Sequence, residues 1–230
     1  MKFPIKLVHG TLIKRYKRFL ADVQLDDGRV VVAHCTNSGS MKSCLENGAE
    51  VYLTPVSDPK RKTKFTWEMI KINNNWVGIN TGNPNKLAFE AVSEGLIPEL
   101  SGYTYVKREV KFGDSRFDVF AENENEKCFI EVKNVSLKEG KYALFPDAVT
   151  TRGQKHLNTL MEVKLQGIRA VMLYIVQRVD IEVFAPASDI DPTYAKMLRE
   201  AVDAGVEVIA MQAKVCPDKI ELIKELPVEI

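Results

Sequence analysis

The chain has 230 residues, enough for one large domain or two small ones with a real hydrophobic core. Its composition, 45% hydrophobic and 27% charged, is that of an ordinary globular protein, and the net charge of +1 does not by itself indicate a nucleic-acid binder. No window approaches the roughly 18 apolar residues of a membrane span, and MKFPIKLVHG at the N-terminus lacks the apolar stretch of a signal peptide. We therefore expect a cytoplasmic protein without a membrane partner.

The four cysteines are scattered along the chain, at Cys35, Cys44, Cys128 and Cys216. They form no Cys-x-x-Cys pair and have no His-rich run beside them, which disfavours a zinc site. Free buried thiols in a reducing compartment are the simplest interpretation. A disulfide between Cys35 and Cys44 is the alternative.

Residues 1–80 have the pattern of an all-β domain. Five short strand-like runs follow one another: KLVHGTLIKRY, RFLADVQL, RVVVAHC, EVYLTPVS and KFTWEMIKI. Asp26-Asp27-Gly28, between the second and third runs, is typical of a hairpin turn. Strands of this number and length fit a small barrel or a sandwich. A five-stranded barrel of the oligonucleotide-binding type (OB fold) has this size.

A basic run in this domain is a candidate nucleic-acid contact. KRYKRF interleaves cationic and aromatic side chains, which neutralise phosphates and stack on bases; its candidate binding residues are Lys14, Arg15, Tyr16, Lys17 and Arg18. A lysine-rich strand edge that resists aggregation is the alternative. Further along, PKRKTKF is a second basic loop, and HCTNSGSM is either a binding loop or a tight structural turn.

Residues 81–230 change to alternating helix and strand patterns. Asn83 is a candidate N-cap and Pro84 the first position of a helix through NKLAFEAV. Two strands are expected around Arg116–Ala121 and Lys127–Asn134. The chain is thus predicted to be α+β with two domains, a small β-barrel at 1–80 and a mixed α/β domain at 81–230.

The last third of the chain continues the alternation. TRGQKHLNTLMEVKLQG predicts a helix that ends at Gly167, with Asp147, Thr150 or Thr151 as its cap. RAVMLYIV is almost wholly apolar, as in a strand covered on both faces. DIDPTYAKMLREAVDAG predicts a helix capped by Asp191, and VEVIAMQAKV a final strand.

The stretch RFDVFAENENEKCFIEVKNV reads as a hairpin with charges on one face. Its polar loop is centred between Glu124 and Asn125, which sets Asp118 directly opposite Glu131. Opposed residues share a face, with Cβ atoms about 4.5–5.5 Å apart. Lys133 lies on that face as well, because strand side chains alternate with a period of two.

Two carboxylates held this close are unfavourable alone, because opposed like charges destabilise a sheet and raise one pKa. A divalent cation removes the conflict, and Mg²⁺ (or Mn²⁺) takes one or two carboxylates together with waters and phosphate oxygens. A neighbouring lysine can orient or deprotonate a water, or neutralise a phosphate. Asp118 and Glu131 as metal ligands, with Lys133, therefore predict a metal-dependent phosphodiesterase. A solvated strand face is the alternative.

The helix that begins DAVTTRGQKHL supplies a candidate phosphate site. Arg152, Lys155, His156 and Thr159 are spaced to share one face. Cationic side chains at a helix N-terminus suit a phosphate. Arg116 lies on the strand face of the first carboxylate and joins this candidate set. A polar outer helix face is the alternative.

At this point the residues carry a resemblance. Asp118, followed after a short loop by Glu131-Val132-Lys133, resembles the PD-(D/E)xK nuclease motif, with Phe117 in place of the proline. Nucleases of this type often bring an acidic residue from the helix before the hairpin. The resemblance makes Glu90, in NKLAFEAV, a candidate catalytic residue.

Six ordered blocks extend the resemblance over nearly the whole chain. RYKRFLADV, AHCTNSGSM, INTGNPNKLAFEA, GDSRFD, IEVKNVSL and ALFPDAVTTRGQKHLNTL together resemble the sugar fermentation stimulation protein A family. The resemblance implies an N-terminal OB-type barrel and a C-terminal nuclease-like domain. The family is described as DNA-binding and linked to the regulation of sugar metabolism, notably of maltose.

Two functions follow as expectations. The first is a DNA-binding protein with a Mg²⁺-dependent nuclease site. The alternative is a non-cleaving DNA-binding transcriptional regulator of sugar metabolism, and the third is a small-molecule or sugar-phosphate binder. RNA stays open as a partner, and a homodimer would let two sites address two strands.

Overall fold

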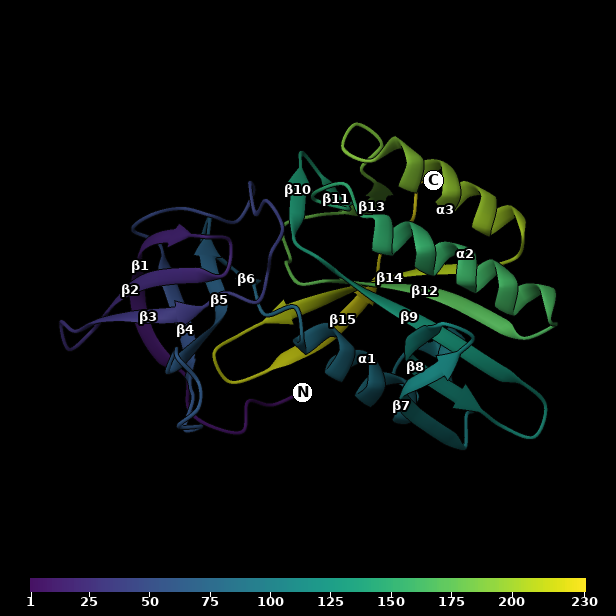
Figure 1. The fold of residues 1–230 in the computed structure, drawn as a ribbon, viewed down its shortest axis with the longest axis horizontal. Helices are drawn as coiled ribbons and strands as arrows, with labels where there is room; N and C mark the ends of the chain where they lie inside the picture. The colour runs from purple at the N-terminus through teal and green to yellow at the C-terminus, as the bar shows by residue number, and fades with distance from the viewer.

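The computed structural model describes all 230 residues, arranged as two lobes (Figure 1). Six strands form the first lobe: β1 (Val8–Tyr16), β2 (Leu20–Leu25), β3 (Val30–His34), β4 (Glu50–Pro55), β5 (Phe65–Ile72) and β6 (Asn75–Gly78). Because β3 pairs with both β2 and β5, strands β1, β2, β3, β5 and β4 close into a barrel. The predicted five-stranded OB barrel is confirmed, and β6 extends it beside β5.

The barrel closes because alternate side chains point inward. In β2, Ala21, Val23 and Leu25 are buried while the residues between them are not. Trp67 on β5 is completely buried in the interior and donates from its ring N–H to the Met69 carbonyl at 2.9 Å. In a small closed barrel the side chains of the strands fill the interior, so no helix is needed to cover the inner face of the sheet.

The second lobe is built on a six-stranded sheet in the order β15-β14-β12-β9-β8-β7. Its strands are β7 (Tyr105–Phe112), β8 (Ser115–Glu122), β9 (Lys127–Val135), β12 (Arg169–Val176), β14 (Glu207–Val215) and β15 (Ile220–Glu225). β9, β12 and β14 are parallel, and the outer neighbours are antiparallel. The sheet is therefore mixed, as predicted.

Helices cover both faces of this sheet (Figure 1). α1 (Asn83–Ser93) packs on one face, and α2 (Thr151–Leu165) and α3 (Pro192–Asp203) pack on the other. Along β12, Val171 and Leu173 join the core under α1, while Met172 and Tyr174 join the core under α2 and α3. Burial on both faces explains why RAVMLYIV is apolar throughout.

The helix starts agree with the sequence at two of three places. Thr150 caps α2 by accepting from the Gly153 amide at 3.0 Å, and Asp191 caps α3 by accepting from the Tyr194 amide at 2.9 Å. The expected cap of α1 is wrong, because Gly82 occupies that position without a side-chain bond. Asn83 is buried and donates instead to Glu68 at 2.9 Å.

Elements that the sequence did not predict include β6, β7, β15, the short helix Pro98–Leu100 and a small third sheet. That sheet pairs β10 (Leu137–Glu139), β11 (Tyr142–Phe145) and β13 (Val183–Pro186) beside the junction of the two lobes. Its strands β10 and β11 connect β9 with the start of α2, and both β9 and α2 contribute residues to the candidate site.

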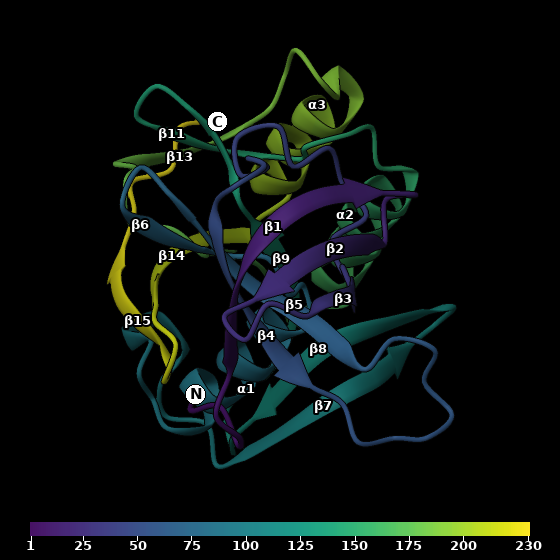
Figure 2. The ribbon, with the colours of Figure 1, turned by 90° about the vertical axis from the view of Figure 1, so that its left-hand side faces the viewer.

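The lobes are joined by buried polar contacts. Arg178 is 1% exposed, pairs with Asp180 at 2.7 Å and donates to the Ser136 carbonyl at 2.7 Å and to Ser43 of the barrel lobe at 3.1 Å. The first residues of the chain also reach the second lobe: the Met1 ammonium donates to the Ile220 carbonyl, below the barrel as seen from the barrel side (Figure 2). These contacts hold the barrel and the sheet in one arrangement.

The structure also bears on the expectations for the cysteines and for membrane-spanning segments. All four cysteines are free, and Cys35, Cys44 and Cys128 are buried, so the Cys35–Cys44 disulfide is not formed. No helix has the length and apolar character needed to cross a membrane.

Candidate functional site

The hairpin of β8 and β9 has the predicted register. Val119 pairs with Ile130, and the ladder runs outward to Glu122 and Lys127. It ends at Val119, one pair earlier than expected, so Asp118 has no direct ladder partner across the hairpin. The two strands therefore separate at the position where the sequence places the carboxylates.

The Asp118 side chain lies where the ladder ends. Its Oδ2 accepts from the Val132 amide at 2.9 Å, in place of a strand-to-strand bond, and its Oδ1 accepts from the Asn85 side chain of α1. On the other side, Glu109 of β7 is left out of the β7–β8 pairing and has a φ of 57°. Residues two apart on a regular strand share a face, but here Phe117 and Val119 belong to the cores on opposite faces of the sheet. Asp118, between them, therefore does not follow the regular alternation.

Glu131 is the most buried charged group of the site, with 3% of its side chain exposed. Its Oε1 accepts from Lys133 Nζ at 2.7 Å and faces Nδ1 of His156 on α2. Its Oε2 is buried and has no hydrogen-bond partner in the protein. A carboxylate oxygen left unpaired in this way is costly and points to a missing ligand.

The pKa values of the two carboxylates are shifted in opposite directions. Burial, with the nearby charge of Glu131, raises the pKa of Asp118 to about 6. Burial also acts to raise the pKa of Glu131, but the hydrogen bond from His156 and the charge of Lys133 outweigh it and hold that pKa below its ordinary value. The pair thus behaves as like charges sharing one site.

His156 is an internal part of the site, because it is only 8% exposed. Arg152 Nε lies 3.4 Å from its Nε2, which makes Nε2 an acceptor and leaves the ring proton on Nδ1 for Glu131. Lys133 Nζ approaches the same Nδ1 to 3.1 Å. His156 therefore orients the Glu131 carboxylate, whereas the sequence suggested a phosphate contact.

Glu90 makes no hydrogen bond or ion pair with the hairpin. It follows Asn85 by five residues, which places it more than one turn along α1 and about 140° round the helix. Its carboxylate pairs with the Met1 ammonium at 3.0 Å. The helix contribution to the site comes instead from Asn85, which the sequence did not suggest because an amide is not an expected ligand.

The other residues of the predicted phosphate-binding set lie around the site, some exposed and one buried. Arg152 and Lys155 of α2 are exposed at the start of the helix, near His156. Arg116 is exposed as well and pairs with Glu109 at 3.7 Å. Thr159 is buried and bonds Ser115 at the start of β8, which fixes α2 against the hairpin.

The basic run of the barrel divides into structural and free side chains. Arg15 donates to the carbonyls of Asn37 and Gly39 at 2.8 and 3.0 Å and so holds a loop. Tyr16 donates to Asp22 at 2.9 Å, and Lys14 lies 3.7 Å from the same carboxylate. The side chains of Lys17 and Arg18, in the turn after β1, have no such partner; they have positive φ values of 50° and 64°.

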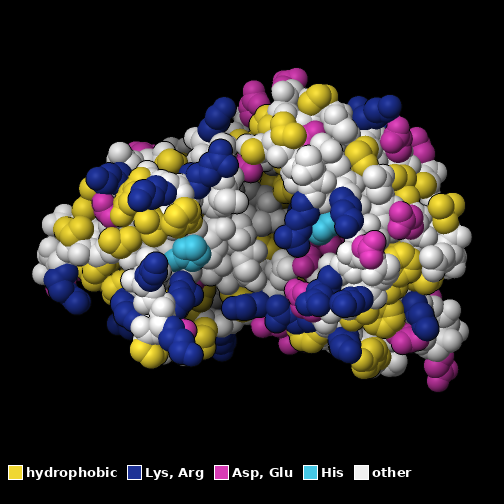
Figure 3. All heavy atoms as spheres, in the orientation of Figure 1, with side chains coloured by type: hydrophobic (Ala, Val, Ile, Leu, Met, Phe, Trp, Pro, Cys, Tyr) yellow, Lys and Arg dark blue, Asp and Glu magenta, His cyan; other side chains and the backbone are white.

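A groove of about 520 Å³ lies on the barrel beside this turn. Tyr16, Phe19 and His34 line it together with Arg61 and Lys62 of the loop between β4 and β5. Figure 3 shows apolar side chains bordered by lysines and arginines on the barrel lobe, and a hollow between the lobes. An aromatic floor with basic edges is common among sites for single-stranded nucleic acid.

The donor set at the hairpin suits a cation that keeps most of its waters. No three His, Cys, Asp or Glu side chains converge as a closed metal site. Two carboxylates are present, however, and Glu131 Oε2 is a free oxygen donor. Mg²⁺ commonly binds proteins through one or two carboxylates, so these residues fit it.

Comparisons with known proteins give consistent matches. The family described as "Sugar fermentation stimulation protein RE domain" matches residues 82–219, and the "SfsA N-terminal OB domain" matches residues 13–79. The "Sugar fermentation stimulation protein homolog" of Geobacter sulfurreducens is 53% identical over 99% of this chain and 98% of its own length. That of Geotalea uraniireducens is 51% identical over the full length of both chains. The solved structure of Pyrococcus furiosus SfsA in complex with Ca²⁺ superimposes with a TM-score of 0.90 at 31% identity, covering 100% of this chain and 98% of the other.

Proposed function

The chain belongs to the sugar fermentation stimulation protein family, and we propose that it is a DNA-binding phosphodiesterase with a divalent cation at Asp118 and Glu131. Mg²⁺ or Mn²⁺ is the proposed cation. The barrel is proposed to hold the nucleic acid, and the hairpin of β8 and β9 to hold the phosphate that is cut.

One observation carries the proposal: the buried carboxylate of Glu131 has one oxygen satisfied twice and the other not at all. A purely structural glutamate would be expected to use both oxygens, because an unpaired buried acceptor costs about 1–3 kcal/mol. A cation at Oε2 would remove that cost and the repulsion from Asp118. The Ca²⁺ complex of the Pyrococcus furiosus relative supports a hard cation in a protein of this fold.

The neighbouring residues have distinct roles in this proposal. When bound, the cation would neutralise phosphate charge and acidify a water. Lys133 uses one of its three N–H donors on Glu131 and keeps the others for the water or for a phosphate oxygen. The hydrogen bond from His156 keeps Glu131 ionised and oriented. Arg152 and Lys155, exposed at the N-terminus of α2, would hold an adjacent phosphate.

The barrel groove supports DNA as the polymer. OB folds bind oligonucleotides across their second and third strands and the loops that follow the first and fourth. Here the loop after the first strand supplies Phe19, the third strand His34, and the loop after the fourth strand Arg61 and Lys62, while Tyr16 ends the first strand beside them. The groove and the hairpin site belong to different lobes, whose fixed junction would keep one strand in contact with both.

The proposal is tested by incubating the purified protein with supercoiled plasmid, single-stranded DNA and RNA in Mg²⁺, in Mn²⁺ and in EDTA. We expect metal-dependent nicking that Lys133→Ala abolishes. If the wild-type protein is as inert as the variant on every substrate while DNA binding persists, the chain is a non-cleaving binder and the phosphodiesterase proposal fails.

A further inference from the structure

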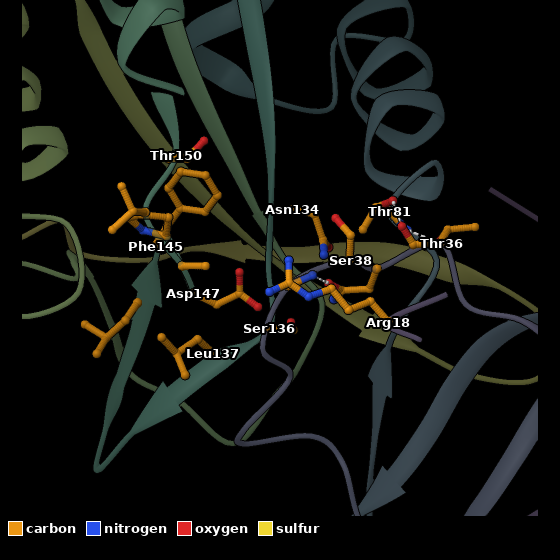
Figure 4. Close-up of a pocket in the computed structure, with 16 residues that line it drawn as sticks. Arg18, Thr36, Ser38, Thr81, Asn134, Ser136, Leu137, Phe145, Asp147 and Thr150 are labelled. Atoms are coloured by element: carbon orange, nitrogen blue, oxygen red, sulfur yellow. Dashed lines mark hydrogen bonds between the residues drawn. The ribbon is translucent and has the colours of Figure 1, made fainter. Parts of the chain in front are cut away.

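A polar cleft lies between the lobes, next to the hairpin site, and the proposed chemistry does not use it. Its volume is about 370 Å³. Arg18 and Ser38 line it from the barrel, and Asn134, Phe145 and Asp147 from the second lobe. Figure 4 shows these side chains facing one another across the space between the lobes.

The cleft is held open by bonds across the junction. The Thr81 amide donates to Thr36 Oγ1 at 3.0 Å, which ties the barrel loop to the linker. Asp147, the other candidate cap of α2, faces the barrel and accepts from the Met41 amide at 3.4 Å. A Cβ at Gly39 would lie 2.0 Å from Asp147 Oδ2, so only glycine allows this approach. The walls are therefore preformed.

The cleft has hydrogen-bonding groups without partners. Asn37 is 5% exposed; its Oδ1 accepts from the Gly39 amide, but its Nδ2 donates to no protein group. Asn134 uses Oδ1 to accept from Gln177 at 2.7 Å, and its Nδ2 is likewise free. Asn37 is buried and Asn134 half-buried, so their free Nδ2 groups, one from each lobe, are accessible from the cleft and suit a ligand with acceptor atoms.

The charge of the cleft argues against a phosphate as that ligand. One cation, Arg18, is balanced by one anion, Asp147, whereas phosphate sites have an excess of donors and positive charge. Two amide donors, a carboxylate acceptor and the Phe145 ring match the edge and the face of a nucleobase. Its volume is near the lower end of ligand pockets, about 300–1,000 Å³, and suits one nucleoside.

The position of the cleft connects it with the proposed chemistry. Asn134 directly follows Lys133 on β9, and Thr150 of the cleft precedes His156 by six residues, about 9 Å of helix. Stacked nucleotides are about 3.4 Å apart along a strand, so the cleft and the hairpin are within about three nucleotides. On the barrel side, Thr36 of the cleft is two residues from His34 of the groove.

Resting on the proposed function, we infer that the cleft holds one unpaired nucleobase close to the bond that is cut, which makes single-stranded DNA the substrate class. In a duplex each base is paired and stacked, so none is free to enter the cleft unless it is flipped out. The strand passes from the barrel groove through the cleft to the hairpin.

The inference is tested by binding in EDTA, where cutting is suppressed. The probe is a labelled single strand of about 16 nucleotides, the upper range for one OB barrel, compared with its duplex and with a strand of abasic sugar-phosphates. Wild-type protein is expected to bind the normal strand at least about tenfold more tightly than either comparison, since the cleft alone contributes one stacked base. Equal affinity for normal and abasic strands would overturn the inference.

Two variants fill the cleft from opposite walls. Ser38→Trp acts from the barrel loop and Val149→Trp from the second lobe; both positions are exposed, so either chain should fold. Each should lose about tenfold in affinity for the normal strand and none for the abasic strand. Ser188→Trp, at an exposed position outside the cleft, is the matched control. If the folded variants keep wild-type affinity, the cleft does not hold a base.

Failure of this inference and failure of the proposed function are separable. Loss of binding in the filled variants, in a protein that never cuts, would support the base site and refute the phosphodiesterase. Metal-dependent nicking with no preference for unpaired bases would support the phosphodiesterase and refute the base site.

Discussion

The imidazole of His156 on α2 donates from Nδ1 to the buried carboxylate of Glu131 on β9, across 25 residues of sequence. The bond commits one carboxylate oxygen and directs the other, Oε2, into a space with no protein donor. In this way a helix on one face of the sheet prepares an oxygen ligand at the end of a hairpin.

Glu131→Gln should abolish metal-dependent cleavage. The amide removes the charge that holds the cation, and losing several kcal/mol of charge stabilisation lowers the rate by more than about a hundredfold. Glu90→Gln is the matched control, because Glu90 pairs with the Met1 ammonium and should keep activity within about twofold. Nicking rates of both variants in Mg²⁺ measure this. A severe loss in the Glu90 variant would place that residue in the site after all.

His156→Ala should shift the pH profile of cleavage. The hydrogen bond from His156 is the largest influence lowering the pKa of Glu131, so without it burial dominates and the pKa rises. The acidic limb of the rate profile then moves to higher pH, and the rate on that limb falls by about tenfold, as for other groups that orient metal ligands. His9→Ala, on the barrel surface, is the control. A lower rate with an unmoved profile would mean that His156 only supports the fold.

Asp118→Asn should stabilise the metal-free protein at neutral pH. The pKa of Asp118 is raised from 3.8 to about 6, so its contribution to stability is full below pH 4 and is lost as pH rises through 6. At pH 7 the ionised group costs up to about 3 kcal/mol, and the amide removes part of that cost. Urea unfolding in EDTA should show the variant gaining about 1–2 kcal/mol at pH 7 relative to pH 4. An equal difference at both pH values would contradict the burial of this charge.

Lys17→Gln and Arg15→Gln should have separate effects. Lys17 is exposed in the turn after β1, so its loss should weaken DNA binding and reduce the salt slope by about one. Arg15 holds the carbonyls of Asn37 and Gly39, so its loss should destabilise the barrel by about 1–3 kcal/mol. Binding against salt concentration, beside urea unfolding, distinguishes them. If both variants change DNA binding and stability to the same extent, the residues of this basic run act as one unit.

The sequence predicted the hairpin because its register depends on local features. A polar loop of known centre and alternating side chains set the pairing of Val119 with Ile130, and the structure has that pairing. It could not predict that the ladder ends there, since the pairing of β8 on its other side is also interrupted at Asp118, opposite Glu109 of β7, a strand that the sequence pattern missed. β7 was missed because most of its side chains are exposed and charged.

Helix positions were predictable where a cap is local and not where a side chain has a distant partner. Thr150 and Asp191 cap helices through amides three residues away. Asn83 looks like a cap, yet it is recruited by Glu68 of the barrel, fifteen residues earlier. Likewise Glu90 has the expected chemistry but points toward Met1, because the helix turns it away from the hairpin.

The sequence by itself determined the two-domain α+β organisation, the barrel strands, the hairpin register and the residue types Asp118, Glu131 and Lys133, since these depend on periodicity, turn chemistry and short spacing. Only the tertiary structure decided which groups complete the site. It buried His156 against Glu131, substituted Asn85 for Glu90, and formed the cleft that Asn37 and Asn134 share. The reason is physical: partners from separate elements meet only when the sheet, the helices and the two lobes pack together.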